Sequence, residues 1–261
     1  RSGGAVAEAL LIEESLFHGN SARLRGGAIN DAEVARRLTL IENVAGFNGG
    51  GAGFSQSFEM TDCIVTNNTI IGNLFRAGTQ VVVSNASGSI ERCVIGGNAA
   101  ADDGQVTSWG ASNVVMRDSL IGGQIRVMGS TIDLRNCTIA ADPGSQVAAI
   151  DVEDDGLIVL QSSAVDAFRS VSVSDEGFAV VIQSAISNGV ASFSGAISRI
   201  DVLGDLRTGD PGFADPLGPD GDWSTWDDND YRLRARSRLI DAGYGIGFSG
   251  EDDLDLAGLD R

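Results

Sequence analysis

The sequence contains no lysine, so its 18 basic residues are all arginines. Any catalytic site that uses a lysine base is therefore excluded. Histidine is nearly absent as well, and His18 is the single candidate for an imidazole acid or base. No segment is typical of a phosphate-binding loop, a serine triad or a zinc site, which removes those classes of enzyme.

Long hydrophobic runs are also missing. No run of about 18 apolar residues occurs, so we expect no membrane-spanning helix. No basic and then apolar leader opens the chain, and the first residues, RSGGAV, already fit the repeats described below. We expect any targeting signal to lie outside this chain.

Positive charge is scarce relative to negative charge, with 36 acidic residues, 18 basic residues and a net charge of −18. Such a field repels nucleic acids and anionic lipids, so neither is an expected partner. Cations and neutral surfaces are better matched to it. Aspartate richness without lysine is typical of a high-GC genome or of a salt-adapted host, and both alternatives stay open.

A recurring pattern organises what the sequence does contain. Runs of β-branched residues with alternating polarity end at Gly, Asn or Asp and return at irregular intervals, which is typical of a parallel β-solenoid. Aligning the runs places a short residue once per turn in one column: Ser15, Asn43, Cys63, Cys93, Ser119, Cys137, Ser163 and Ala185. We expect the cysteines to be buried thiols rather than a redox or metal site, because parallel Cβ directions are poorly placed for a disulfide.

A second column supports the solenoid independently. IDVEDDGLIV (150–159) aligns with VSVSDEGFAV (171–180), and IRVMGSTIDL (125–134) is a shorter relative of both. Each segment pairs one strand, a small or acidic turn and the next strand, so two faces of a coil are visible. The predicted fold class is all-β, a single-stranded parallel β-helix of about nine coils over residues 1–204.

Motifs in the first coils resemble a known family. FHGN (17–20) is followed by GGAI (26–29), and GGAV (3–6) precedes both. This pairing resembles the FxxN and GGA[ILV] repeats of the chlamydial polymorphic outer membrane proteins and, more widely, the pectin-lyase-like superfamily. The resemblance implies a right-handed parallel β-helix and is nearly silent on activity. Asn20, Asn48, Asn68 and Asn98 form the expected asparagine ladder.

The C-terminal region carries a second resemblance. GDPGFADPLGPDGDWSTWDDNDYRLRARSRLIDAGYG (209–245) and DLDLAGLDR (253–261) are similar to the tail of bacterial right-handed β-helix proteins, including the choice-of-anchor Q proteins. A solenoid needs its last coil covered, so we expect residues 205–261 to be a C-terminal aromatic cap. The expected plug comprises Phe213, Trp223, Trp226, Tyr231, Leu233, Leu239 and Ile240.

Carboxylates crowd two regions and are the candidate metal ligands. The second column offers Asp151, Glu153, Asp154, Asp155, Asp175 and Glu176, and the cap offers Asp215, Asp220, Asp222, Asp227, Asp228 and Asp230. Ca²⁺ takes six to eight oxygen ligands and would relieve repulsion among these groups, so it is the one expected cofactor. The alternatives are a solvated acidic turn for the first set and pairing with the cap arginines for the second.

Three residues are candidates for catalysis, namely Arg126, Asp151 and His18. An arginine base beside acidic calcium ligands, as in some pectate lyases, is what the resemblance implies for Arg126 or Arg135 near Asp151. A lone histidine at a repeat corner is more typical of an idle, exposed side chain. Trp109 is a candidate platform for stacking a sugar ring, and the alternative for it is a core or corner aromatic.

Two functions are compatible with these features. The expected function is a secreted or cell-surface bacterial module, structural or adhesive, non-enzymatic and stabilised by calcium, with a polysaccharide or a surface protein as partner. It is favoured because histidine, lysine and aromatic residues are not concentrated on the coils. The alternative is a polysaccharide-active enzyme, either a lyase, a hydrolase or an epimerase, that acts on an acidic glycan.

Overall fold

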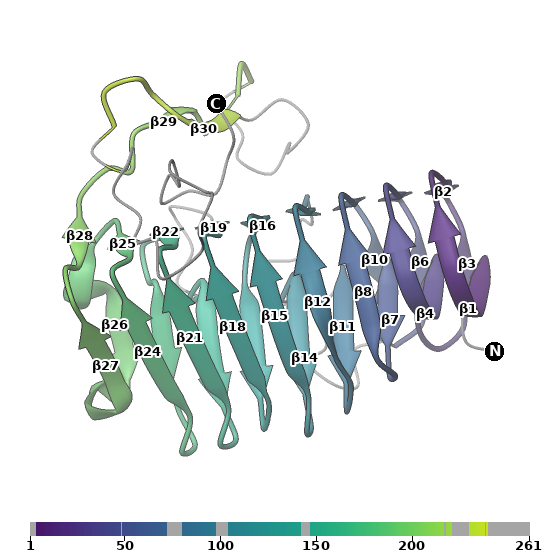
Figure 1. Cartoon of the computed structure of the whole chain (residues 1–261), viewed down its shortest axis with the longest axis horizontal. Coiled ribbons are helices and arrows are strands. Elements are labelled where there is room, and N and C mark those ends of the chain that lie inside the picture. Colours follow the sequence, from purple (N-terminus) through teal and green to yellow (C-terminus); the bar gives the residue numbers. More distant parts are fainter. Residues whose placement is uncertain are drawn as a thin grey trace, which may run out of the picture.

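A computed structural model describes residues 4–47, 49–71, 80–97, 104–141, 147–216, 218–220, 230–237 and 239. Over these residues the chain is almost entirely strand and winds into a parallel β-solenoid of about 8 turns (Figure 1). The predicted fold class is confirmed, and the expected number of coils is close to the observed one. In this part of the chain no helix is long and apolar enough to cross a bilayer.

Three faces run along the solenoid, each a stack of parallel strands about 4.8 Å apart. Faces 1 and 2 are the two arms of a 16-stranded sheet and meet at β4 (Ile29–Arg36), which also pairs with β1 (Val6–Glu13). Face 3 is a separate 9-stranded sheet, and a 3-stranded sheet follows it along the chain in the first coils.

The strands are short and recur in the same order in each coil. Face 1 comprises β7 (Ala52–Phe54), β11 (Val81–Ser84), β14 (Val106–Trp109), β17 (Ile125–Met128), β20 (Ile150–Glu153), β23 (Val171–Val173) and β26 (Phe193–Gly195). Face 2 comprises β8 (Phe58–Thr61), β12 (Ser87–Glu91), β15 (Asn113–Arg117), β18 (Thr131–Arg135), β21 (Leu157–Gln161), β24 (Phe178–Ile182) and β27 (Ile200–Leu203). Face 3 comprises β2 (Leu16–His18), β5 (Thr39–Ile41), β9 (Ile64–Thr66), β13 (Val94–Gly96), β16 (Leu120–Gly122), β19 (Thr138–Ala140), β22 (Ala164–Asp166), β25 (Ala185–Ile186) and β28 (Arg207–Thr208). The small sheet comprises β3 (Ser21–Ala22), β6 (Val44–Ala45) and β10 (Thr69–Ile70), and the described 3-10 helices are η1 (Gly189–Ser192) and η2 (Ile197–Arg199).

The alternation of side chains along each strand decides what it buries. In β15, Val114 and Met116 point into the solenoid and are fully buried, whereas Val115 and Arg117 point outward. The same alternation in successive coils stacks aliphatic side chains into one continuous core along the axis. Removal of this apolar surface from water is the main force that stabilises the coil.

The corner between faces 2 and 3 repeats two residues in each coil. The first has a positive φ, as in Glu14 (φ 48), Asp62 (φ 54) and Gln183 (φ 42). The second precedes the strand of face 3 and is buried in each of these coils except the first. In the adjacent coil another residue holds the same position as this second residue. The backbone N–H that follows it donates a hydrogen bond to the carbonyl of the second residue. The observed column is therefore Ser15, Leu38, Cys63, Cys93, Ser119, Cys137, Ser163 and Ser184.

Two members of the predicted column are wrong. Leu38 takes the place expected for Asn43, because the similar letters of LLIEESLFHGN and LTLIENVAGFN belong to different strands of the coil. Ser184 takes the place expected for Ala185, since β21 pairs with β24 one residue earlier than the letters suggest. The second column is confirmed: Arg126, Asp151 and Ser172 pair in register.

A ladder of asparagines accompanies face 3 in the first coils. Asn43 Oδ1 accepts hydrogen bonds from the backbone N–H and the side-chain amide of Asn20, and Asn68 Oδ1 accepts the same pair from Asn43, all at 2.9 Å. Asn43 thus occupies the coil for which Asn48 was the expected member. Asn48 and Asn98 lie outside the described residues.

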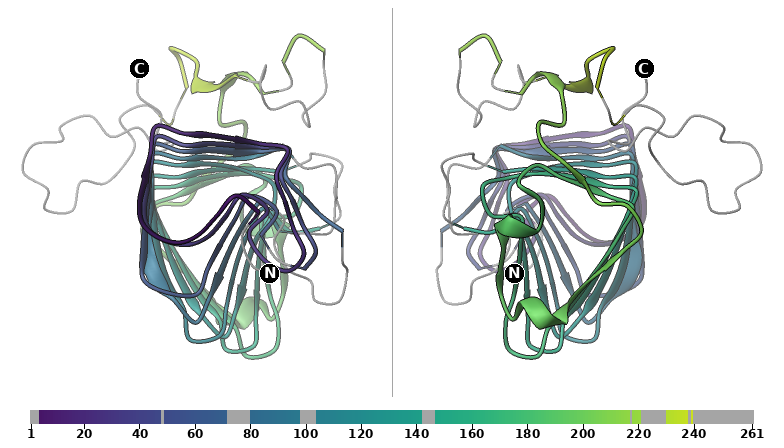
Figure 2. Two further views of the ribbon diagram at one scale, coloured as in Figure 1. Left: turned by 90° about the vertical axis from the view of Figure 1, so that its right-hand side faces the viewer. Right: turned by 90° about the vertical axis from the view of Figure 1, so that its left-hand side faces the viewer.

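Beyond β28 (Arg207–Thr208), the described C-terminal strands lie along the side of the solenoid, over the later strands of face 3 (Figures 1 and 2). Its strands β29 (Phe213–Asp215) and β30 (Asp230–Leu233) form an antiparallel pair. The rings of Phe213 and Tyr231 meet edge to face and pack on Leu120 and Ala140, and Leu239 packs on Ala164 and Ala185. Phe213, Tyr231 and Leu239, which were expected to cover the last coil, thus pack on the outward apolar residues of face 3 instead. The capping role of residues 205–261 stays a prediction. Trp223, Trp226 and Ile240 lie outside the described residues.

Candidate functional site

The strongest candidate site lies on the outer surface of face 1. Ile and Val residues at alternate positions of β17, β20 and β23 point inward and are fully buried. The residues between them therefore point outward, and in-register pairing stacks Arg126, Asp151 and Ser172 in one column. Glu153 follows Asp151 two residues later on the same side of β20.

The Arg126 guanidinium lies between two carboxylates. Its Nη2 is 3.5 Å from Asp151 Oδ2 and 3.4 Å from Glu153 Oε1. The Arg126 side chain is only 6% exposed, and those of Asp151 and Glu153 are 15% and 17% exposed. The three groups form a largely desolvated cluster in which one positive charge faces two acids.

Desolvation strongly perturbs one of these acids. Burial raises the pKa of Asp151 to about 6, and the hydrogen bond and the charge of Glu153 act in the same direction. The positive charge of Arg126 and a hydrogen bond from Ser172 lower the pKa and only partly offset this effect. Asp151 can therefore hold a proton close to neutral pH, which suits it to proton transfer.

Two neighbours extend the cluster along β14. Thr107 pairs in register with Arg126 and is fully buried, and its hydroxyl has no hydrogen-bond partner among the described residues. Trp109 pairs with Met128, and Met128 pairs with Glu153, so these three residues form the neighbouring outward column. Trp109 is partly exposed. The tryptophan thus lies outside the core, on the same face as the acids.

The acidic turn between faces 1 and 2 is separate from this cluster. Asp154, Asp155, Asp175 and Glu176 are exposed and have positive φ values, and the backbone N–H of Asp155 donates to the carbonyl of Asp175 at 3.1 Å. In the described ranges no three His, Cys, Asp or Glu side chains are grouped as ligands for one metal ion. The calcium site stays a prediction.

The acids of the C-terminal region are only partly described. Asp215 pairs in register with Asp230 across the hairpin. A bidentate contact with Arg232, at 2.9 and 2.6 Å, lowers the pKa of Asp230. This is the arginine pairing that was the alternative to calcium. Asp220 is exposed, and Asp222, Asp227 and Asp228 lie outside the described residues.

The remaining catalytic candidates lie elsewhere. His18 is exposed on face 3, with its Nε2 3.0 Å from Glu42 Oε2. Arg135 is on face 2, where it binds Asp133 of its own strand. The structure therefore brings together Arg126, Asp151 and Glu153 and leaves His18 and Arg135 out of the cluster.

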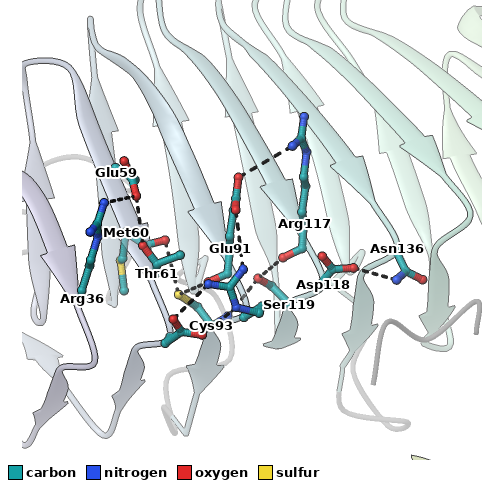
Figure 3. Close-up of polar contacts among 12 residues, drawn as sticks. Arg36, Glu59, Met60, Thr61, Glu91, Cys93, Arg117, Asp118, Ser119 and Asn136 are labelled. Carbon is teal, nitrogen blue, oxygen red and sulfur yellow. Dashed lines mark hydrogen bonds and ion pairs between the residues drawn. The ribbon is translucent and has the colours of Figure 1, made fainter. Parts of the chain in front are cut away.

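A ladder of ion pairs along face 2 and its corner is a feature that the sequence analysis missed, and Figure 3 shows part of it, with Arg36–Glu59 and Arg117–Glu91 labelled. Its pairs join adjacent coils: Arg37–Glu14 at 2.8 Å, Arg36–Glu59 at 2.9 Å, Arg92–Asp62 at 2.7 Å and Arg117–Glu91 at 3.8 Å. At the positive-φ position the sign alternates along the axis in the order Glu14, Arg37, Asp62, Arg92 and Asp118. This alternation is the signal that could have revealed the ladder, once the corner column is aligned correctly.

The cysteines are free and buried, as expected. Cys63 and Cys93 occupy adjacent coils, and the backbone N–H of Cys63 donates to Cys93 Sγ at 3.4 Å. Burial raises the pKa of Cys137 to about 12 and that of Cys93 well above its ordinary value. Those two thiols are therefore protonated, inert fillers of the coil at neutral pH.

A cavity of about 240 Å³ separates the end of face 3 from the C-terminal region. Its lining comprises Ala185, Leu206, Arg207, Thr208, Gly209, Asp210 and Leu239. None of the predicted site residues lines it, and its single acid and single arginine define no particular ligand.

Comparison with known proteins adds no assignment to this geometry. No protein-family model, curated protein or solved structure matches the chain. The description of the parallel β-solenoid and of the Arg126 cluster therefore depends only on the sequence and structure of this chain.

Proposed function

We propose that this chain is a secreted or cell-surface bacterial module with a structural or adhesive role, built as a rigid rod. The observation that carries the proposal is the ladder of ion pairs, because it uses exposed charges to join each coil to the next along four intervals. Each exposed pair contributes little by itself, about 0.2–1 kcal/mol. A series of them, together with the asparagine ladder of the first coils, favours one register over the N-terminal half of the rod.

Glycine positions support a relationship to the families that the motifs resemble. In the GGAI motif Gly26 has φ +58, and a Cβ on Gly27 would lie 2.0 Å from the carbonyl oxygen of Gly50. A Cβ on Gly4, in the GGAV motif, would lie 1.7 Å from the carbonyl oxygen of Gly27. The motif thus matches a steric requirement of the stacked corner. We infer a right-handed helix of the pectin-lyase-like kind, with a polysaccharide or a surface protein as partner.

Calcium stabilisation belongs to the same proposal. The exposed carboxylates of Asp154, Asp155, Asp175 and Glu176 stack on adjacent coils and are available to a divalent cation. A melting temperature that rises with millimolar calcium and falls again with chelator supports this part of the proposal. An unchanged melting temperature removes calcium from it.

A second candidate function is favoured by the Arg126 cluster. Burial raises the pKa of Asp151 to about 6, which suits it to proton transfer beside Glu153, and Arg126 supplies a positive charge within 3.5 Å of both acids. In a polysaccharide hydrolase, Asp151 would donate its proton to the oxygen of the leaving sugar while Glu153 takes a proton from the water that attacks the anomeric carbon. Arg126 would bind the carboxylate of an acidic glycan. Trp109, on the same face, would stack against a sugar ring.

The two functions are separated by incubation of the rod with uronate and neutral polysaccharides, with calcium and with chelator. Chain length, unsaturated ends and retention of the polymer on immobilised protein are measured together. Retention without cleavage supports the adhesive rod. Cleavage that is lost in Asp151→Asn and in Glu153→Gln overturns it in favour of the enzyme, and Asp133→Asn on face 2 is the matched control.

A further inference from the structure

The search for a further site leads to the first coil, whose three strands lie at the edges of their sheets. Among the described strands, β1 pairs with β4 alone, and β2 and β3 are the outermost strands of the sheets that hold them. The left view of Figure 2 looks onto this coil, and no described segment crosses it. Within the described residues, the first coil is therefore an open end of the solenoid.

The apolar core is uncovered at this open end. Val6 and Phe17 pack against the core but are only half-buried, whereas their register partners in the second coil, Ile29 and Leu40, are each 1% exposed. Leu10 of the first coil is 73% exposed. In the second coil the inward side chains have a coil on either side of them, so what the first coil lacks is a neighbour of the same cross-section.

The asparagine ladder is unfinished at the same end. Asn43 Oδ1 accepts two hydrogen bonds from Asn20, and Asn68 Oδ1 accepts two from Asn43, but no described residue donates to Asn20 Oδ1. Asn43 Nδ2 also donates backwards to the carbonyl of Phe17 in the first coil, at 2.9 Å. The group that would complete the ladder is therefore another asparagine, on a coil that stacks beyond Asn20.

Charge at the open end favours a basic neighbour. The described residues of the first coil, 4–22, contain no arginine and three exposed acids, which are Glu8, Glu13 and Glu14. At the positive-φ corner the sign alternates from Glu14 to Arg37 to Asp62, so the position beyond Glu14 is that of a basic residue. Asp62 has an arginine in the coil on either side, whereas Glu14 has Arg37 on one side only.

We propose that the open end is a docking surface for one further parallel coil, from a partner segment that carries a basic residue at the corner and an asparagine at the ladder. Stacked about 4.8 Å from the first coil, this segment would pair with β1, β2 and β3 by main-chain hydrogen bonds and cover Val6 and Phe17. Its contacts are those that the rod already repeats between coils. Docking needs neither the adhesive nor the enzymatic role, so its failure would leave both untouched.

A second copy of this chain does not offer such a coil. At the corner of its last coil Gly204, which stacks on Gln183, stands where the partner needs a basic residue. Asp201 and Asp205 beside it are exposed. End-to-end stacking of two copies would therefore bring these acids against the three acids of the first coil, without the alternation of sign that joins the other coils.

A copy of residues 27–49, fused directly before Gly4 of the full chain, tests the docking. Gly4 and Gly27 hold the same position in adjacent coils, so the copy has the length of one coil, and the fusion gives it a high effective concentration. Amide hydrogen exchange in peptides covering 6–13 and 16–22 should slow at least about tenfold relative to the unfused chain. Exchange in β24 should not change, which checks that the solenoid is folded.

Substitutions in the copy alone test the stated chemistry. Arg37→Glu with Asn43→Ala should lose most of the protection, because the copy then repels Glu14 and leaves Asn20 Oδ1 without a donor. Thr39→Ala, at an outward position of β5, is the matched control and should keep it.

Three results would overturn the proposal. Unchanged exchange in the fused chain would show that the open end takes no coil. Equal protection by the doubly substituted copy would show that any apolar cover suffices. End-to-end dimers of the unfused chain, seen by sedimentation at about 1 mM, would assign the open end to a second copy.

Discussion

Asp151 is the residue at which burial and charge conflict most clearly. Its pKa is raised from 3.8 to about 6, so the folded chain binds a proton that the unfolded chain releases between these values. Proton binding by this group contributes up to about 3 kcal/mol to the free energy of unfolding. The contribution is fully present below about pH 4 and is lost as the pH rises to about 6.

Asp151→Asn should therefore be more stable than the wild type at pH 7, and the two should converge near pH 4. Asn keeps the size of the side chain but cannot ionise, so the variant has no such loss. Urea denaturation from pH 3.5 to 8 measures the difference between them. A difference that does not change with pH would show that Asp151 ionises normally. Asp133→Asn, on the exposed side of face 2, is the control.

The small column at the corner makes a second prediction for single residues. Cys137 Sγ donates to the carbonyl of Arg135 at 3.3 Å, and Ser119 and Ser163 make the same contact in their own coils. Cys137→Ser should change the free energy of unfolding by less than about 1 kcal/mol. Cys137→Val, which adds bulk and removes the donor, should cost about 1–3 kcal/mol. Equal losses in both variants, measured by denaturant midpoints, would contradict a hydrogen-bonding role for this column.

At the scale of elements, the ion-pair ladder should act between coils. Arg92 binds Asp62 of the previous coil at 2.7 and 3.0 Å, with both side chains about half exposed. Arg92→Asp should cost about 1 kcal/mol, and the swap Asp62→Arg with Arg92→Asp should recover more than half of it. The loss should shrink in 1 M salt. A double-mutant cycle is required, because Asp also tolerates the positive φ of this position better than Arg does.

Arg23→Asp changes the net charge equally and is the control for the ladder. Arg23 is exposed, and no ion pair joins it to the described residues. A coupling energy of zero between positions 62 and 92 at low salt would contradict the ladder. Loss of stability in Arg23→Asp as large as in Arg92→Asp would assign the effect to net charge alone.

The elements themselves were predictable because each strand alternates and each corner repeats. The alignment of 150–159 with 171–180 is correct to the residue, and it places Arg126, Asp151 and Ser172 in one column. Asn43 was misplaced because similar residues occur in strands that belong to different faces. The burial of Arg126 and the raised pKa of Asp151 could not be predicted from the sequence, because both depend on how Arg126, Asp151 and Glu153 pack against each other in the folded chain.

At the scale of the whole molecule, the chain combines a solenoid with a hairpin that lies on its side. The position of the hairpin could not be predicted, since Val94, Leu120 and Ala140 look like ordinary strand residues until the register shows that they point outward. Coils of a solenoid depend on their neighbours, whereas the described hairpin strands pair with each other and pack on face 3 through a few apolar side chains. The hairpin should therefore open without unfolding the coils.

Tyr231→Ala tests this independence. Tyr231 is 5% exposed, and its ring lies 5.5 Å from that of Phe213, so truncation removes most of the apolar contact with face 3. Amide hydrogen exchange in peptides covering 211–216 and 230–237 should accelerate on the order of 100-fold, and exchange in β15 should not change. Arg232→Ala, exposed on the same strand, should leave both unchanged. Faster exchange throughout the solenoid would instead show that hairpin and coils unfold as one cooperative unit, because the covered half of face 3 would then be essential to the core.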